Sequence, residues 1–184
     1  MRILLCSITT ILLLSTIAHG QNRDLVKPAA KKDNSALIYG PGMSFRIMPP
    51  RGWSQDSTPH LMHGEHTVFF PVSQKWQTAP LVIYIGVKAY DGKLSEFIES
   101  DLLSYKKTKK DIVIKNGHSI KVDEGGRAEV REVLGDEYGN YAAIAYIQEK
   151  TGVVMVIMIS KNETRYESNY ERFETVVRSY RLME

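Results

Sequence analysis

The chain of 184 residues is almost free of cysteine, since its only cysteine is Cys6 in an apolar stretch at the start. The rest of the chain therefore has no thiol. This excludes cysteine nucleophiles, thiolate zinc sites, iron–sulfur clusters and disulfide bonds from residues 7–184. A chain of this length can bury a hydrophobic core without disulfide bonds.

Long hydrophobic runs are also scarce, and the one at Ile3–Ile17 is shorter than the ~20 residues that a membrane-spanning helix needs. Arg2 precedes this run, and Ala18-His19-Gly20 places small residues at positions −3 and −1 of a cleavage site. This pattern is typical of a cleaved secretory signal, whereas an uncleaved membrane anchor is the competing interpretation.

We therefore predict a signal peptide at residues 1–20, a flexible leader at residues 21–35 and a single domain at residues 36–184. The protein would be exported, either to a periplasm or out of the cell, and would have no transmembrane span after cleavage.

A strong net charge is missing as well. The chain has 24 Lys and Arg against 21 Asp and Glu, so its formal net charge is +3. This balance argues against nucleic acid as a partner, because nucleic-acid-binding domains usually carry a strongly basic surface.

Catalytic motifs are missing too. The sequence contains no G-x-S-x-G elbow of a serine hydrolase and no phosphate-binding glycine loop with its lysine. We expect no catalytic residues and no cofactor, and predict that the protein is not an enzyme. A hydrolase whose site is assembled from distant positions stays as an alternative.

What the sequence contains is mostly strand patterns. In GMSFRIM, Met43, Phe45 and Ile47 alternate on one face, and a proline pair ends the strand. The dipeptide Asn116-Gly117 lies between two further β-rich segments and predicts a two-residue hairpin. The other predicted strands are at residues 66–72, 81–90, 127–134, 141–148 and 153–159.

Two segments have the periodicity of amphipathic helices, at residues 94–107 and 164–180. The strand at residues 153–159 is apolar at every position, so both of its faces should be covered. We therefore predict an α+β fold, in which an antiparallel sheet of about six or seven strands has helices packed on its faces.

The order of these elements resembles the PsbP-like fold over residues 36–184. The motifs that carry the resemblance are FRIMPPRGW with its Pro50-Arg51-Gly52-Trp53 start, the helix that begins LSEF, the hairpin GDEYGNYAAIAYI and the last helix ERFETVVRSYRL. This group includes the PsbP extrinsic proteins of photosystem II, the Ran-binding Mog proteins and, most similar here, uncharacterised exported bacterial proteins. The resemblance implies an α/β/α sandwich and a non-enzymatic binding or accessory role, with no catalytic set of residues.

A cluster of histidines predicts a possible metal site. The segment PHLMHGEH contains His60, His63, Glu65 and His66, which include three of the five histidines of the chain. His60 and His63 would share one face of a helical turn and could bind zinc or copper through their imidazoles. Glu65 and His66 would compete for a third position, because neighbours in a strand point to opposite faces. The alternative interpretation is a polar loop.

Two further groups could bind a partner, either a protein or an anionic envelope component. Lys106, Lys107, Lys109 and Lys110 follow one another closely after the first predicted helix. They could dock on an anionic surface, or they could only complement the negative end of that helix. The second group is Trp53 and Trp76, which could anchor a partner or cover an end of the core.

Overall fold

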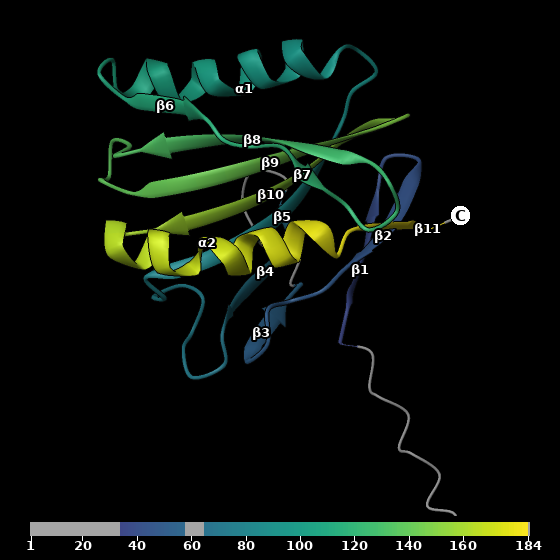
Figure 1. Ribbon diagram of the computed structural model, residues 1–184, viewed down its shortest axis with the longest axis horizontal. Coiled ribbons are helices and arrows are strands. Elements are labelled where there is room, and N and C mark those ends of the chain that lie inside the picture. The colour runs from purple at the N-terminus through teal and green to yellow at the C-terminus, as the bar shows by residue number, and fades with distance from the viewer. Residues whose placement is uncertain (1–33, 58–64, 184) are drawn as a thin grey trace, which may run out of the picture. The chain divides into compact units, whose positions relative to one another are not determined.

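The computed structural model describes residues 34–57 and 65–183, and its helices and strands are labelled in Figure 1. The strands are β1 Ala36–Gly40, β2 Met43–Ile47, β3 Trp53–Asp56, β4 Glu65–Pro71, β5 Leu81–Ala89, β6 Val113–Asn116, β7 Ile120–Lys121, β8 Arg127–Leu134, β9 Tyr141–Glu149, β10 Gly152–Ser160 and β11 Arg181–Met183. The helices are α1 Leu94–Thr108 and α2 Glu163–Arg178.

Within the described residues, the main sheet has eight strands, and each pair of neighbours is antiparallel. Its order is β3-β4-β5-β10-β9-β8-β6, with β7 also paired to β8. The predicted α+β fold with an antiparallel sheet is therefore confirmed, and the sheet is slightly larger than expected. A second sheet of order β1-β2-β11 brings together strands from the two ends of the described chain.

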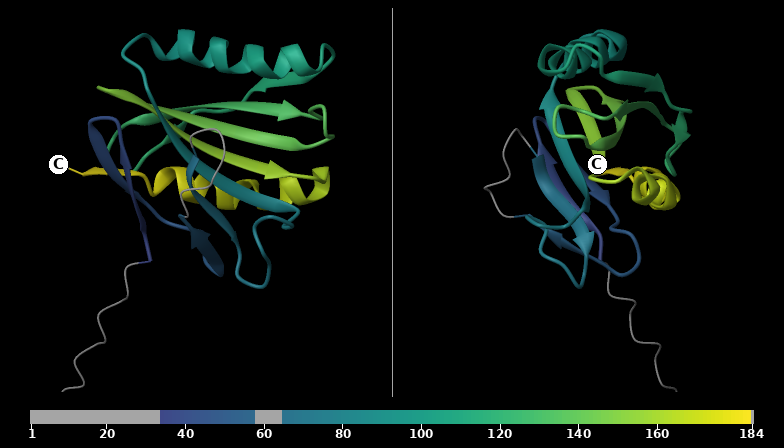
Figure 2. Two further views of the ribbon diagram at one scale, coloured as in Figure 1. Left: turned by 180° about the vertical axis from the view of Figure 1, so that it is seen from behind. Right: turned by 90° about the vertical axis from the view of Figure 1, so that its left-hand side faces the viewer.

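The two helices cover opposite faces of the main sheet (Figure 2). Along β9, Ala142, Ile144 and Tyr146 pack in the cluster that contains the buried residues of α1. The intervening Ala143 and Ala145 pack in the cluster that contains the buried residues of α2. This alternation follows from the two-residue period of a strand, and it explains why the central strands are apolar at successive positions.

The predicted hairpin at Asn116-Gly117 is wrong. Segments β6 and β7 on either side of this dipeptide do not pair with each other, because both pair with β8. The backbone N–H of Gly117 donates to the carbonyl of Val130 in β8, at 3.0 Å. The chain therefore continues along β8 at this point instead of reversing.

Helix α2 begins with a side-chain cap. The side chain of Asn162 accepts a hydrogen bond from the backbone N–H of Arg165, at 3.0 Å. This bond satisfies one of the donors that the first turn of a helix leaves without a partner. Neither described helix is long and apolar enough to span a membrane.

Candidate functional site

Helix α2 separates residues of opposite charge along its two sides. Arg165, Ser168 and Arg172 recur at spacings of three and four residues and line a groove on one side of the helix. Glu163 and Glu167 have the same kind of spacing and line a second groove. Because a helix repeats every 3.6 residues, each set lies along one side of the helix.

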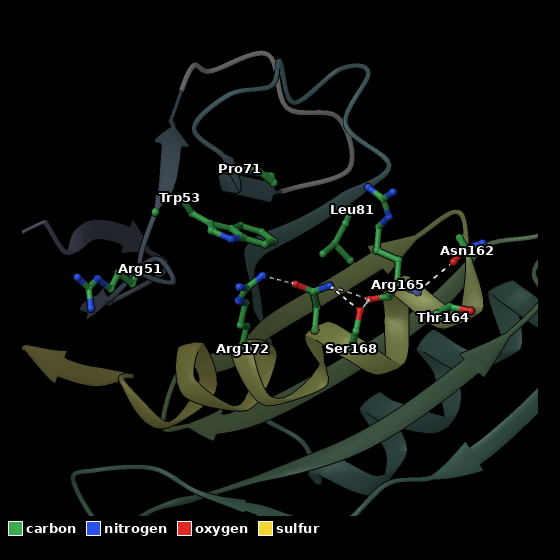
Figure 3. A pocket seen from close by; sticks show the side chains of 11 residues that line it. Arg51, Trp53, Pro71, Leu81, Asn162, Thr164, Arg165, Ser168 and Arg172 are labelled. Carbon is green, nitrogen blue, oxygen red and sulfur yellow. Dashed lines mark hydrogen bonds between the residues drawn. The ribbon is translucent and has the colours of Figure 1, made fainter.

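The first groove, which we call the arginine groove, lies between α2 and the ends of β3, β4 and β5. Its volume is about 580 Å³. Figure 3 shows Trp53 pointing from β3 toward α2, while the side chains of α2 face the same space. The lining residues are Arg51, Gly52, Trp53, Pro71, Leu81, Asn162, Thr164, Arg165, Ser168, Asn169 and Arg172.

A network of hydrogen bonds within α2 holds one of the arginines in place. The side-chain amide of Asn169, whose exposed fraction is 8%, donates to the backbone carbonyl of Arg165 at 2.9 Å. Its carbonyl oxygen accepts from Nη1 of Arg172 at 2.6 Å. The guanidinium of Arg172 is therefore oriented before any ligand arrives, which lowers the entropic cost of binding.

A tight turn at residues 50–53 positions the residues at the other end of the arginine groove. The backbone N–H of Trp53 donates to the carbonyl of Pro50 at 3.0 Å, and Gly52 within this turn has a φ of 79°. This left-handed conformation is accessible to glycine at little cost. The turn brings Arg51 to the groove and lets the half-buried ring of Trp53 pack on the core cluster of α2.

The charges of the arginine groove are all of one sign. Among the described residues that line it, three are arginines and none is acidic. Arg165 and Arg172 are two helical turns apart, which corresponds to about 10 Å along the axis. Guanidinium groups pair with carboxylates and phosphates through two parallel hydrogen bonds. The groove is therefore suited to a ligand with one or more anionic groups.

The predicted metal site falls mainly outside the described residues. His60 and His63 are not among them, so this part of the prediction stays a prediction. Glu65 begins β4, as expected from the sequence. The pairing of β4 with β5 shifts register between Glu65 and Thr67, so His66 lies at an irregularity. Among the described residues, no group of three or more His, Cys, Asp and Glu side chains could hold a metal.

The predicted lysine cluster is not uniform. Lys106, Lys107 and Lys110 are exposed at and after the end of α1. Lys109 is less exposed, and its ammonium donates to the carbonyl of Gly135 at 2.6 Å. A docking role for the cluster stays a prediction, and Lys109 has a contact within the fold as well.

Trp76 lies away from the arginine groove, in the connection between β4 and β5. Its ring packs against the buried cluster of Val68, Ala79 and Val82. Its indole N–H donates to the carboxylate of Asp56 at 3.0 Å. This packing matches the alternative in which the ring covers an end of the core. Trp53 both packs on the core and lines a groove, so it is the better placed of the two to contact a partner.

Sequence reasoning missed the three arginines of the groove. Arg51 is more than one hundred residues from the other two, so their proximity depends on the fold. A partial signal was present in α2, where Arg165 and Arg172 share one side of the helix.

Neither a protein-family model nor a curated protein matches this chain. Several solved structures do match its fold. Cyanobacterial PsbP (CyanoP) from Synechocystis sp. PCC 6803 is 12% identical with a TM-score of 0.54, over 82% of this chain and 93% of that chain. LpqN of Mycobacterium tuberculosis, described as involved in cell envelope biogenesis, is 10% identical with a TM-score of 0.53, over 82% of this chain and 91% of that chain.

The Ran-binding protein Mog1p of Saccharomyces cerevisiae is also similar, at 14% identity with a TM-score of 0.49, over 80% of this chain and 95% of that chain. Identities this low relate folds and not activities. The likeness to the first two structures, which extends over most of each chain, shows that this protein has a PsbP-like fold.

Proposed function

We propose that the protein is an exported, non-enzymatic binding or accessory protein of the bacterial envelope, and that the arginine groove holds an anionic group of its partner. The observation that carries this proposal is the lining of the groove, which contains Arg51, Arg165, Arg172 and Trp53 and has no carboxylate among its described residues. The partner is either a protein or an anionic envelope component.

The arrangement favours binding over catalysis. The side chains that line the groove supply guanidinium, amide and hydroxyl donors beside one aromatic ring. Such groups attract and orient an anion, and the ring adds apolar contact area. General acid–base catalysis would need a carboxylate, histidine or comparable group in reach of the ligand, and the described lining of the groove has none.

An envelope location is supported by the secretory pattern at residues 1–20. It is also consistent with LpqN, which has the same kind of fold and is described as involved in cell envelope biogenesis. The alternatives from the sequence, a metal-binding protein that uses His60–His66 and a hydrolase with an unrecognised site, stay predictions.

The proposal is tested by retention of the purified protein on the envelope fraction of its own cells. We expect retention at low salt, and we expect the Arg165→Gln, Arg172→Gln double variant to bind roughly tenfold or more weakly, because two charge-assisted contacts are lost. In two-dimensional NMR spectra, the indole N–H signal of Trp53 should shift on binding, while that of Trp76 should stay in place.

The matched control is the Lys106→Gln, Lys107→Gln, Lys110→Gln variant, which removes three exposed cations from another part of the surface. If the arginine groove is the site, this control should retain most of its affinity. An equal loss in both variants would indicate that only overall charge matters, whereas a loss in the lysine variant alone would place the docking surface at the end of α1.

A further inference from the structure

The second groove lies on the opposite side of α2, between this helix, the segment around β6 and strands β8 and β9. We call it the tyrosine groove, and its volume is about 370 Å³. It is independent of the arginine groove and of the function proposed for it. Its lining residues are Lys115, His118, Glu132, Leu134, Tyr141, Glu163, Tyr166, Glu167 and Tyr170.

Four aromatic rings follow one another along this groove. The centroids of Tyr141 and Tyr166 are 6.2 Å apart, those of Tyr166 and Tyr170 are 5.8 Å apart, and those of Tyr170 and His118 are 6.0 Å apart. The planes of Tyr166 and Tyr170 meet at 74°, so the rings do not form a flat stack. Rings set at an angle can present both faces and edges to one ligand, and the face of an aromatic ring attracts a cation.

Three carboxylates of the described residues line the same groove. Glu132 accepts a hydrogen bond from the hydroxyl of Tyr166 at 2.8 Å, and Glu163 and Glu167 extend into solvent from α2. Burial, together with the negative charges of Glu132 and Glu174, raises the pKa of Tyr170 to about 12. The environment of the rings is therefore negative, which is the reverse of the arginine groove.

Packing within the fold fixes the positions of the rings. The exposed fraction of Tyr166 is 4%, and the ring of His118 is tied to Glu174 by a contact of 2.6 Å between Nε2 and Oε1. The hydroxyl of Tyr170 is buried without a hydrogen-bond partner among the described residues. It lies close to Gly117, where an added Cβ would be 3.4 Å from it. This leaves the ring of Tyr170, and not its hydroxyl, available to a ligand.

We propose that the tyrosine groove binds an organic ammonium ion through the partly exposed rings of Tyr141 and Tyr170 and the charges of its three glutamates. Aromatic rings beside carboxylates favour a cation that is large and weakly hydrated, since such a cation loses little hydration energy on entering. A metal ion would need carboxylates that converge, and the described residues contain no such group. Lys115 also lines the groove and should oppose a cationic ligand.

Choline chloride is a suitable probe, and its neutral isostere 3,3-dimethylbutan-1-ol is the matched ligand control. We expect choline to shift the ring signals of Tyr141, Tyr166 and Tyr170 in NMR titrations, with little response to the isostere. Vesicles of phosphatidylcholine, compared with vesicles of phosphatidylglycerol, separate a lipid headgroup from a free ammonium ion as the source of the cation. No choline binding, or equal binding of choline and its isostere, would overturn the proposal.

Substitutions of single charged residues test the contribution of charge to binding in the tyrosine groove. Glu167→Gln should weaken choline binding by about threefold to tenfold, while Glu171→Gln, which changes an exposed glutamate outside the groove, should have little effect. Lys115→Gln should strengthen binding, because it removes a like charge. Equal losses in the two glutamate variants would assign the effect to overall charge and contradict the proposal.

Two substitutions at one position test the rings. Tyr170→Phe keeps the ring and removes a buried hydroxyl that has no partner among the described residues, so binding should persist without loss of stability. Tyr170→Leu removes the ring and should weaken choline binding by about fivefold. Because Tyr170→Leu also affects packing, its affinity is compared with that of Tyr141→Leu, which removes a different half-buried ring. If neither leucine variant weakens binding while both stay folded, the rings are not the site.

Discussion

At the scale of single residues, the turn between β8 and β9 is specified by one aspartate. The carboxylate of Asp136 accepts hydrogen bonds from the backbone N–H groups of Tyr138 and Asn140, at 2.9 and 2.8 Å, and from the side-chain amide of Asn140 at 2.9 Å. Gly135 and Gly139 have φ values of 69° and 75°, which glycine adopts readily. The oxygen atoms of this segment therefore serve the turn itself.

We predict that Asp136→Ala lowers the free energy of unfolding by about 1–2 kcal/mol, because several hydrogen bonds to a charged acceptor are lost together. Urea unfolding followed by circular dichroism measures this change. Glu137→Ala is the matched control, since the neighbouring side chain is exposed, and its effect should stay within about 0.5 kcal/mol. Equal stabilities of the two variants would show that the turn does not depend on the aspartate.

At the scale of elements, Gly117 shows how tertiary contacts can override a local signal. The dipeptide Asn116-Gly117 predicts a hairpin because both of its residues tolerate positive φ. In the structure, however, Gly117 does not have positive φ, and an added Cβ would be 2.7 Å from Cγ1 of Val130. Glycine is needed at this position because the side chain of Val130 in β8 occupies the space that a Cβ would take. The local sequence does not reveal this contact.

We predict that Gly117→Ala destabilises the protein by about 1–3 kcal/mol, as overpacking in a filled core usually does. Its control is Asn116→Ala at an exposed neighbouring position, which should have an effect of about 0.5 kcal/mol or less. Thermal and urea unfolding measure both. A tolerated Gly117→Ala combined with a costly Asn116→Ala would instead support a turn that depends on the asparagine.

The difference between local sequence patterns and tertiary contacts also explains which elements could be predicted. Strands and helices with a clear period, such as β2 and α2, follow from which positions are apolar. By contrast, β11 was missed because its three residues are too few to show a period. It is a strand because it pairs with β2, which lies near the other end of the described chain. The arginine groove was missed for a related reason, since only the folded arrangement of the chain places Arg51 and the arginines of α2 along one groove.

At the scale of the whole molecule, three buried tyrosines of the described residues donate hydrogen bonds to carboxylates on other elements of the fold. Tyr146 of β9 donates to Asp101 of α1, and Tyr166 of α2 donates to Glu132 of β8, each at 2.8 Å. Tyr180, which follows α2, donates to Glu149 at the end of β9, also at 2.8 Å. Burial is the main reason why the pKa of each of these tyrosines is raised well above its ordinary value, and the hydrogen-bonded carboxylates add to it.

These raised pKa values make stability depend on pH in the alkaline range. An unfolded tyrosine loses its proton near pH ~10, whereas the folded protein keeps these three protons to a higher pH. Above pH ~10 the unfolded state therefore binds fewer protons than the folded state, and the free energy of unfolding must fall as pH rises. The stabilisation is fully present below pH ~10, and each tyrosine contributes a slope of about −1.4 kcal/mol per pH unit above it.

We predict that Tyr146→Phe makes this decline less steep by about 1.4 kcal/mol per pH unit, because the proton that folded Tyr146 retains no longer contributes to the difference between the two states. Urea unfolding at several values between about pH 9 and about pH 11.5 measures the slope. The matched control is Tyr138→Phe, whose ring is 80% exposed and which should leave the slope unchanged. An unchanged slope in Tyr146→Phe would mean that the buried tyrosines do not set the alkaline limit. A reduced slope in both variants would assign the effect to tyrosine content and not to burial between the helices and the sheet.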